Sequence, residues 1–166
     1  EVMSIGRTFK EAMQKALRSL EIGIYGLEEI HLKDMEKIHP KEEKNKLREL
    51  LKKSHFQRLF HICSAIRRGV STQEVHQLTH IDPWFLYNLK QIIDQEVEIS
   101  CKRLTPKRLK KAKQYGFSDR YLAKLTGKQE SDIFRMRVNQ NLYPVYKRVD
   151  TCAAEFEAYT PYLYST

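Results

Sequence analysis

The 166-residue sequence has few of the residues that build disulfide scaffolds, membrane spans or flexible tails. It contains three cysteines, six glycines, five prolines and one tryptophan. No apolar run approaches the roughly 20 residues that cross a bilayer, and no basic segment followed by an apolar one opens the chain. These features predict a folded cytoplasmic protein without a membrane partner, and the opening Glu1 indicates a piece of a longer chain.

Cysteine and histidine do not form a metal-binding pattern. Cys63, Cys101 and Cys152 are an odd number at separations of 38 and 51 residues, which fits neither a disulfide framework nor a C-x-x-C pair. Reduced thiols are therefore expected. His76 and His80 have the i,i+4 spacing of a metal-binding pair, but the sequence offers no third ligand nearby, and we predict no zinc site.

Catalytic motifs are also missing. The sequence has no Gly-x-x-x-x-Gly-Lys phosphate loop, no G-x-G-x-x-G turn, no G-x-S-x-G elbow and no H-E-x-x-H pair. Paired acidic residues such as Glu155 and Glu157 are typical of a solvated surface when no pocket is evident. The sequence predicts no catalytic residue, no cofactor site and no metal site within these 166 residues.

Positive charge is plentiful and unevenly placed. The net charge is +9, and residues 101–148 carry 14 lysines and arginines against three acidic residues. A basic block of this kind is suited to a nucleic acid, an acidic membrane surface or an acidic protein partner.

Apolar residues recur at spacings of three and four, which is the signature of amphipathic helices. Helices are predicted over about residues 9–20, 41–53, 54–68, 84–97 and 105–115, with a short helix after Ser71. The stripe of the third helix includes Phe56. Start signals support these assignments, because Thr8 with Glu11, Asp82-Pro83 and Thr105-Pro106 are typical of helix N-termini.

A repeat connects two of these regions. Residues 69–71 (Gly-Val-Ser) align with residues 116–118 (Gly-Phe-Ser) at an offset of 47 residues. At the same offset, Val75, Leu78 and Thr79 align with Leu122, Leu125 and Thr126. Each copy contains a helix, a glycine turn, a serine-capped short helix, a threonine and a longer helix. The fold class predicted is all-α, with two similar multi-helix units.

The last 25 residues have a different texture. Residues 142–149 and 159–164 are aromatic, β-branched and interrupted by proline, which favours extended chain or strand. Because two strands alone do not make a stable sheet, this extended C-terminal segment is expected to open the next domain.

The second repeat copy has the proportions of a helix-turn-helix DNA reader. In this interpretation Arg135 and Arg137 contact bases while the lysines of residues 107–113 contact phosphates. The alternative is that the same pattern only packs three short helices. The first copy argues against DNA, because residues 59–100 have a net charge of −2.

Motifs at both ends and in the middle resemble one family. Residues 1–9 with 14–18, Asp82-Pro83-Trp84-Phe85-Leu86, residues 116–119, and residues 144–156 with 162–166 occur in the order found in the large chain of carbamoyl phosphate synthase. The resemblance implies the end of the first synthetase unit at 1–26, the helical oligomerisation domain at 27–141 and the start of the second synthetase unit at 142–166.

In that family the parent enzyme is an ATP-dependent ligase. The resemblance implies a glutaminase small chain as partner, a homo-oligomer of the large chain, and ATP with Mg or Mn as cofactors bound outside this stretch. It implies no specific nucleic-acid partner. The product, carbamoyl phosphate, is made from bicarbonate, glutamine-derived ammonia and two ATP and feeds arginine and pyrimidine synthesis.

The resemblance also suggests three site residues. Glu155 is a candidate for an acid facing the family's carbamate tunnel, or else a surface or inter-domain salt-bridge carboxylate. Trp84 and Phe85 are candidates for oligomer or inter-domain contacts, with the alternative that they fill the space between the two helical units.

Overall fold

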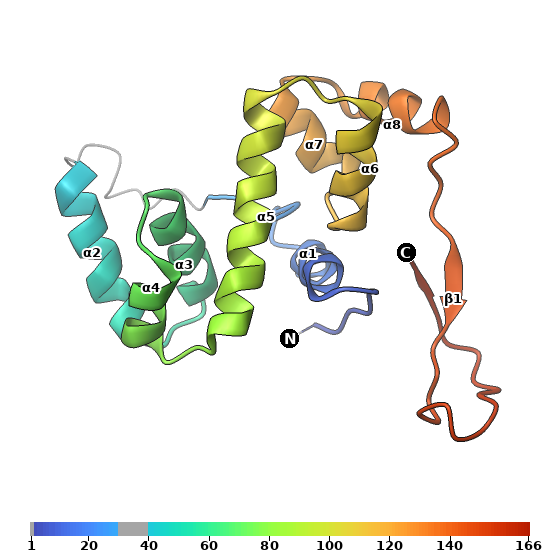
Figure 1. Ribbon diagram of the computed structural model, residues 1–166, viewed down its shortest axis with the longest axis horizontal. Helices are drawn as coiled ribbons and strands as arrows, with labels where there is room; N and C mark the ends of the chain where they lie inside the picture. The colour runs from blue at the N-terminus through green and yellow to red at the C-terminus, as the bar shows by residue number, and fades with distance from the viewer. Residues whose placement is uncertain (1, 30–39) are drawn as a thin grey trace. The chain divides into compact units, whose positions relative to one another are not determined.

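The structure is a computed structural model that describes residues 2–29 and 40–166, with side chains described from residue 42 in the second range. Within these residues the chain is mostly helical, which confirms the all-α prediction (Figure 1). The elements are α1 Phe9–Ser19, α2 Pro40–Lys52, α3 Arg58–Arg67, α4 Thr72–Thr79, α5 Pro83–Cys101, α6 Pro106–Gln114, α7 Asp119–Thr126, α8 Glu130–Val138, β1 Tyr146–Arg148 and β2 Leu163–Ser165.

The chain divides into two compact units. Unit 1 joins the residues up to Gly26 with Lys102–Thr166, and unit 2 contains the described residues between Leu27 and Cys101. No helix in the described part of the chain is both long and apolar enough to cross a membrane.

Unit 2 is a four-helix arrangement. Helix α2 packs against α3 and α4, and α5 packs against the same two helices (Figure 1). Leu47 and Leu51 of α2 are fully buried, as are Val75 of α4 and Leu86 and Ile92 of α5. Burial of each such side chain stabilises the unit by roughly 1.5–3 kcal/mol. These buried apolar residues of the helices form the core of unit 2.

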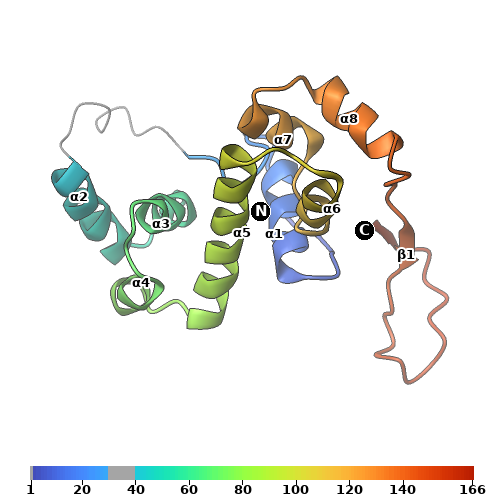
Figure 2. The same cartoon turned by 45° about the horizontal axis from the view of Figure 1, so that its top comes forward.

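Unit 1 combines the first helix with the second repeat copy. Helices α6, α7 and α8 follow one another, α7 packs against α8, and α1 belongs to the same unit (Figure 2). Its core includes Leu109, Phe117, Leu122 and Ile133, which are at most 1% exposed, and Leu17 of α1, which is 2% exposed. Residues distant in sequence therefore build one core.

The predicted repeat is confirmed in backbone detail. Helix α7 begins and ends 47 residues after α4, and α8 begins 47 residues after α5. Ser71 and Ser118 cap the short helices, and each accepts a hydrogen bond from a backbone N–H three residues later, at 3.1 and 3.0 Å. The hydroxyls of Thr79 and Thr126 each donate to the carbonyl four residues earlier, at 2.7 Å.

The other helix starts agree with the sequence signals. Thr8 accepts from Glu11 N at 3.2 Å, whereas the Glu11 carboxylate accepts from Arg7 N at 2.8 Å, one residue before the capping position. Asp82 accepts from Trp84 N at 2.8 Å ahead of α5, which runs to Cys101, four residues beyond the predicted end.

One predicted helix begins later than expected. Helix α3 starts at Arg58 instead of Ser54, because a turn precedes it in which Arg58 N donates to His55 O at 3.0 Å. Gln57 N donates to His55 Nδ1 at 3.3 Å in the same turn. Phe56 lies in this turn and is 91% exposed, so its predicted place in the apolar stripe is wrong.

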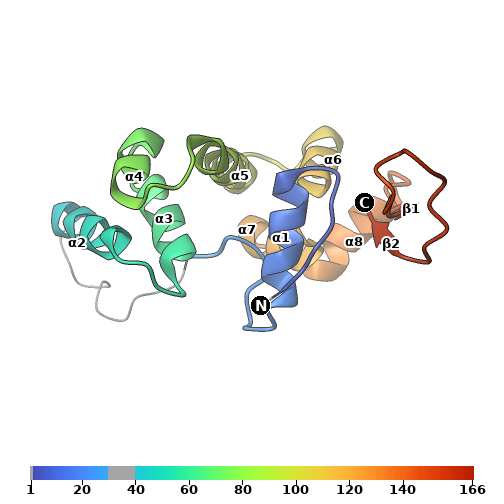
Figure 3. The same cartoon turned by 90° about the horizontal axis from the view of Figure 1, so that it is seen from below.

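The extended C-terminal segment forms a hairpin in which β1 and β2 pair antiparallel, with Lys147 opposite Tyr164 (Figure 3). Contacts with α1 support this small sheet: Lys15 Nζ donates to Ser165 O, and Thr166 Oγ1 donates to Glu11 Oε2 at 3.0 Å. The strand prediction is confirmed, and the end of β2 is hydrogen-bonded to α1.

Candidate functional site

Trp84 and Phe85 lie in the first turn of α5 and are 55% and 43% exposed. Their rings meet edge to face with centroids 5.0 Å apart. Tyr87, three residues after Trp84 in the same helix, is also exposed, at 58%, and we group it with these two residues as the aromatic cluster. Tyr87 was not among the predicted contact residues, although its i+3 spacing from Trp84 indicates a shared helix face.

The helix that carries this cluster is firmly held inside unit 2. Arg67 of α3 forms an ion pair of 2.7 Å with Glu96 of α5, and both side chains are only 13% exposed. Arg67 also donates to the carbonyl of Leu27. Because the opposite side of α5 buries Leu89 and Ile93, the aromatic cluster is presented from a fixed helix.

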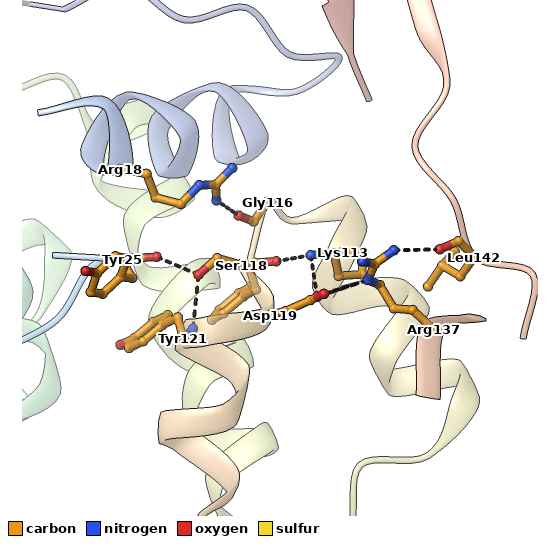
Figure 4. A network of polar contacts seen from close by, with 10 residues as sticks. Arg18, Tyr25, Lys113, Gly116, Ser118, Asp119, Tyr121, Arg137 and Leu142 are labelled. Carbon is orange, nitrogen blue, oxygen red and sulfur yellow. Dashed lines mark hydrogen bonds and ion pairs between the residues drawn. The ribbon is translucent and has the colours of Figure 1, made fainter. Parts of the chain in front are cut away.

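A second group of polar residues joins the elements of unit 1 (Figure 4). Asp119, at the start of α7, accepts from Arg137 Nε at 2.8 Å and from Lys113 Nζ at 3.0 Å. Lys113 also donates to Phe117 O at 2.7 Å, and Arg137 donates to Leu142 O at 3.1 Å. One carboxylate thus connects α6, α7, α8 and the segment that leads to β1.

The N-terminal part of the chain is tied to the same turn. Arg18 of α1 donates to Gly116 O at 2.5 Å, and Ser118 Oγ donates to Tyr25 O at 3.1 Å (Figure 4). Burial lowers the pKa of Arg18 and of Lys113 from the ordinary values, with Glu11 and Asp119 opposing the shift for Arg18 and Asp119 for Lys113. The central position of Asp119 in this group was not predicted from the sequence.

These contacts bear on the helix-turn-helix interpretation. Arg137 is 14% exposed and Lys113 is 27% exposed, and both are bound to Asp119. Arg135 is 71% exposed and pairs with Asp132 at 2.6 Å. The three-helix geometry is present, but two of the cations assigned to DNA hold the unit together instead.

Glu155 lies in the connection between β1 and β2 and is exposed. Its backbone N donates to Cys152 O at 3.0 Å. This placement leaves its role as a tunnel-facing acid a prediction.

No group of three potential metal-ligating side chains occurs among the residues that the structure describes. Of the His76 and His80 pair, for which no zinc site was predicted, His76 has one ring nitrogen in a polar contact: its Nδ1 lies 2.7 Å from Ile81 O. The three cysteines are free, and burial raises the pKa of the Cys63 thiol to about 12. A thiol of that pKa remains protonated and unreactive near neutral pH.

The described residues form two helical units, of which unit 2 has exposed aromatic side chains and unit 1 has a net positive charge. Residues 1–141 match the family described as carbamoyl-phosphate synthetase large chain, oligomerisation domain. The chain therefore belongs to this family, and the nucleic-acid interpretation receives no support from the comparisons.

Several curated relatives match this chain along its whole length. It is 46% identical over 166 residues to the carbamoyl phosphate synthase large chain, N-terminal section, of Aquifex aeolicus, and covers 28% of that protein. It is 47% identical over 166 residues to the large chain of Thermotoga neapolitana and covers 14% of it. It is 46% identical over 171 aligned residues to the large chain of Myxococcus xanthus, of which it covers 15%.

Proposed function

We propose that this chain is the self-association and linking module of a carbamoyl phosphate synthase large chain, and that unit 2 provides the contact between copies. The observation that carries the proposal is the exposed cluster of Trp84, Phe85 and Tyr87 on a helix that the unit holds rigidly. Exposed aromatic residues of this kind are frequent anchors of protein interfaces.

Charge supports the choice of unit 2. Residues 27–101 contain 12 lysines and arginines and 12 acidic residues, whereas the remaining residues contain 18 and nine. The whole net charge of +9 therefore belongs to unit 1. Two copies that meet through unit 2 avoid the direct apposition of like charge that a unit 1 contact would require.

Sedimentation velocity of the large chain across a concentration and salt series tests this proposal. The 166-residue chain alone is expected to be a monomer at low micromolar concentration and to shift toward a dimer as protein or salt increases. The double substitution Trp84→Ala/Phe85→Ala should weaken self-association at least about tenfold in either protein. Phe56→Ala removes a more exposed aromatic ring from the same unit and serves as the control.

The proposal fails if the double variant associates like the unsubstituted protein. It also fails if Phe56→Ala weakens association equally, because the effect would then report general loss of apolar surface. Circular dichroism of each variant checks that the helices are retained, as expected for substitutions of exposed side chains.

The chain spans 14–28% of the length of the three relatives named above. We propose that it is part of a longer protein with the activity of this family. That protein would be a cytoplasmic ligase using ATP with Mg or Mn, supplied with ammonia by a glutaminase small chain. We propose the division 1–26, 27–141 and 142–166, with the catalytic residues outside. The 166-residue chain should show no bicarbonate-dependent ATP hydrolysis, and turnover that survives repurification would contradict this.

For Glu155 we propose the tunnel role, supported by its place in the segment that resembles the start of the second synthetase unit. Glu155→Gln in the large chain should reduce carbamoyl phosphate formed per ATP consumed, while a surface carboxylate would leave that ratio unchanged. Exposed Glu157→Gln, two residues away, is the matched control.

A further inference from the structure

Unit 1 contains a cavity of about 590 Å³. Its walls come from the start of α1, from α6, from α8 and from the segment before β1. Cavities of about 300–1,000 Å³ are the usual size of small-molecule sites in proteins. Of the 13 lining residues, five are cationic and one is a carboxylate: Arg7, Lys10, Lys110, Lys113 and Arg137 face the cavity together with Glu11.

The lining carboxylate, Glu11, also binds groups other than these cationic side chains. Glu11 Oε1 pairs with Lys15 at 2.8 Å, and Lys15 does not line the cavity. Glu11 Oε2 accepts from Arg7 N at 2.8 Å and from Thr166 Oγ1 at 3.0 Å. Its two oxygens are therefore engaged by groups other than the cationic side chains that line the cavity.

The remaining negative charge near the cavity is shared. Asp119 binds both Lys113 and Arg137, so a single carboxylate serves two cations. Among the described residues the exposed side chains of Arg7 and Lys110 have no ionic partner. The cavity consequently gathers more positive charge than its surroundings balance.

Convergence of like charges is unfavourable unless an anion offsets it. Burial is the main cause that lowers the pKa of Lys113; Asp119 opposes this shift, and the neighbouring cations Arg137 and Arg18 add to it more weakly. Arginine and lysine side chains around a concave site are the groups by which proteins bind phosphoryl oxygens.

We propose that this cavity binds a small phosphate-bearing anion, with Arg7 and Lys110 contacting it from the exposed side, while Lys113 and Arg137 remain bound to Asp119 and add positive charge at the buried side. The ligand would contact α1, α6, α8 and the segment before β1 at once. Binding would therefore stabilise the junction between the two ends of this chain. This inference does not depend on the contact proposed for unit 2.

The test uses lysine acetylation of the full-length large chain, read residue by residue by mass spectrometry, with sodium pyrophosphate as the probe. Residue-level detection separates this cavity from any phosphate site elsewhere in the protein. Acetylation of Lys10 and Lys110 should slow in a saturable manner, with a midpoint below about 1 mM at matched ionic strength. Lys107 and Lys128, which are exposed and outside the cavity, should react at an unchanged rate.

A charge-matched pair of variants sharpens the result. Arg7→Gln/Lys110→Gln should move the midpoint for Lys10 protection at least about tenfold higher. Lys107→Gln/Lys128→Gln removes the same charge and should not move it. Because all four side chains are exposed, neither variant is expected to unfold.

Three outcomes would overturn the proposal. Equal slowing at Lys107 and Lys128 would show general screening of a basic surface. Absence of saturation up to about 10 mM would show that no site exists. Protection of Lys110 in the full-length protein without pyrophosphate would show that another part of the large chain fills the cavity.

Discussion

Helices α3–α5 and α6–α8 are two copies of one backbone pattern, yet different polar contacts hold them. In the first copy Arg67 of α3 pairs directly with Glu96 of α5. Gln114 and Tyr143 stand at the equivalent positions, 47 residues later. The ion pair that closes the first copy therefore cannot form in the second.

The second copy is held by a different set of ion pairs, centred on one carboxylate. Asp119 at the start of α7 binds one cation from α6 and one from α8. The equivalent residues of the first copy are Thr72 for the acid and Ile66 and Lys90 for the cations. Residues that shape the backbone are retained between the copies, whereas residues that join each copy to its surroundings have diverged.

The two copies also differ in the helix that packs with them and in the net charge of their unit. The first copy packs with α2 in a unit of zero net charge, and the second packs with α1 in a unit of net charge +9. One fold pattern thus supports two surfaces of different chemistry. A unit of zero net charge with exposed aromatic rings suits self-association, and a cationic unit suits an anionic ligand or an acidic neighbour.

The largest expected effect comes from removing the acid that distinguishes the second copy. Asp119→Ala leaves Lys113 and Arg137 facing each other without a carboxylate, and all three side chains are mostly buried. Loss of one partner from such a group costs about 3–5 kcal/mol. The free energy of unfolding of unit 1, measured by native-state hydrogen exchange, should fall by about this amount.

The matched change in the first copy is Asp94→Ala. Asp94 pairs with Lys90, the equivalent of Arg137, but both side chains are about half exposed. Exposed pairs at i,i+4 contribute under about 0.5 kcal/mol. Similar losses in the two variants would contradict the view that the second copy depends on a buried polar centre.

The next effect concerns the glycine that ends the first helix of each copy. Gly69 and Gly116 both have positive φ, +78° and +88°. A Cβ at Gly69 would meet only Lys44 Nζ at 3.7 Å, whereas one at Gly116 would lie 2.9 Å from Glu11 Cα and 3.0 Å from Glu11 O. The backbone of α1 would have to move only in the second case.

We therefore expect Gly69→Ala to cost about 1 kcal/mol, the strain of a left-handed alanine. Gly116→Ala should cost about 3 kcal/mol, because displacement of α1 is added to that strain. Urea denaturation followed by unit-resolved hydrogen exchange measures both. Equal costs would mean that α1 does not press against this turn in solution.

Local sequence signals predicted the helices and the repeat well. Capping residues such as Ser71 and Ser118 act within three residues, so the sequence contains everything needed to place them. The 47-residue offset followed from retained glycine, serine and threonine. The prediction that Phe56 belongs to the apolar face of a helix was wrong, because Phe56 lies in a turn stabilised by the His55 side chain.

Contacts between distant residues could not be derived in this way. Asp119 meets Arg137 across 18 residues and Ser118 meets Tyr25 across 93, and no periodicity encodes either contact. The grouping of the first 26 residues with the second copy depends on the same long-range contacts. For the candidate surface, the sequence suggested Trp84 and Phe85, and the helix geometry added Tyr87.

The smallest expected effect is a difference in acid sensitivity. All six histidines lie between residues 27 and 101, and the equivalent of His61 in the second copy is Arg108. Burial, and then the neighbouring His55, lower the pKa of His61 below its ordinary value of 6.5. His61 Nδ1 lies 3.1 Å from His55 Nε2, so a proton on His61 would be placed beside another imidazole.

Because the pKa of His61 is lower in the folded protein than in the unfolded chain, the unfolded chain binds more protons as the pH falls through 6.5. The stability of unit 2 should therefore decrease on acidification from about pH 7 to pH 5, as seen in hydrogen exchange of α3 amides. His61→Gln should reduce this dependence, whereas His80→Asn, at an exposed left-handed position, should retain it. A His61→Gln variant with an undiminished acid response would show that another group of unit 2 controls it.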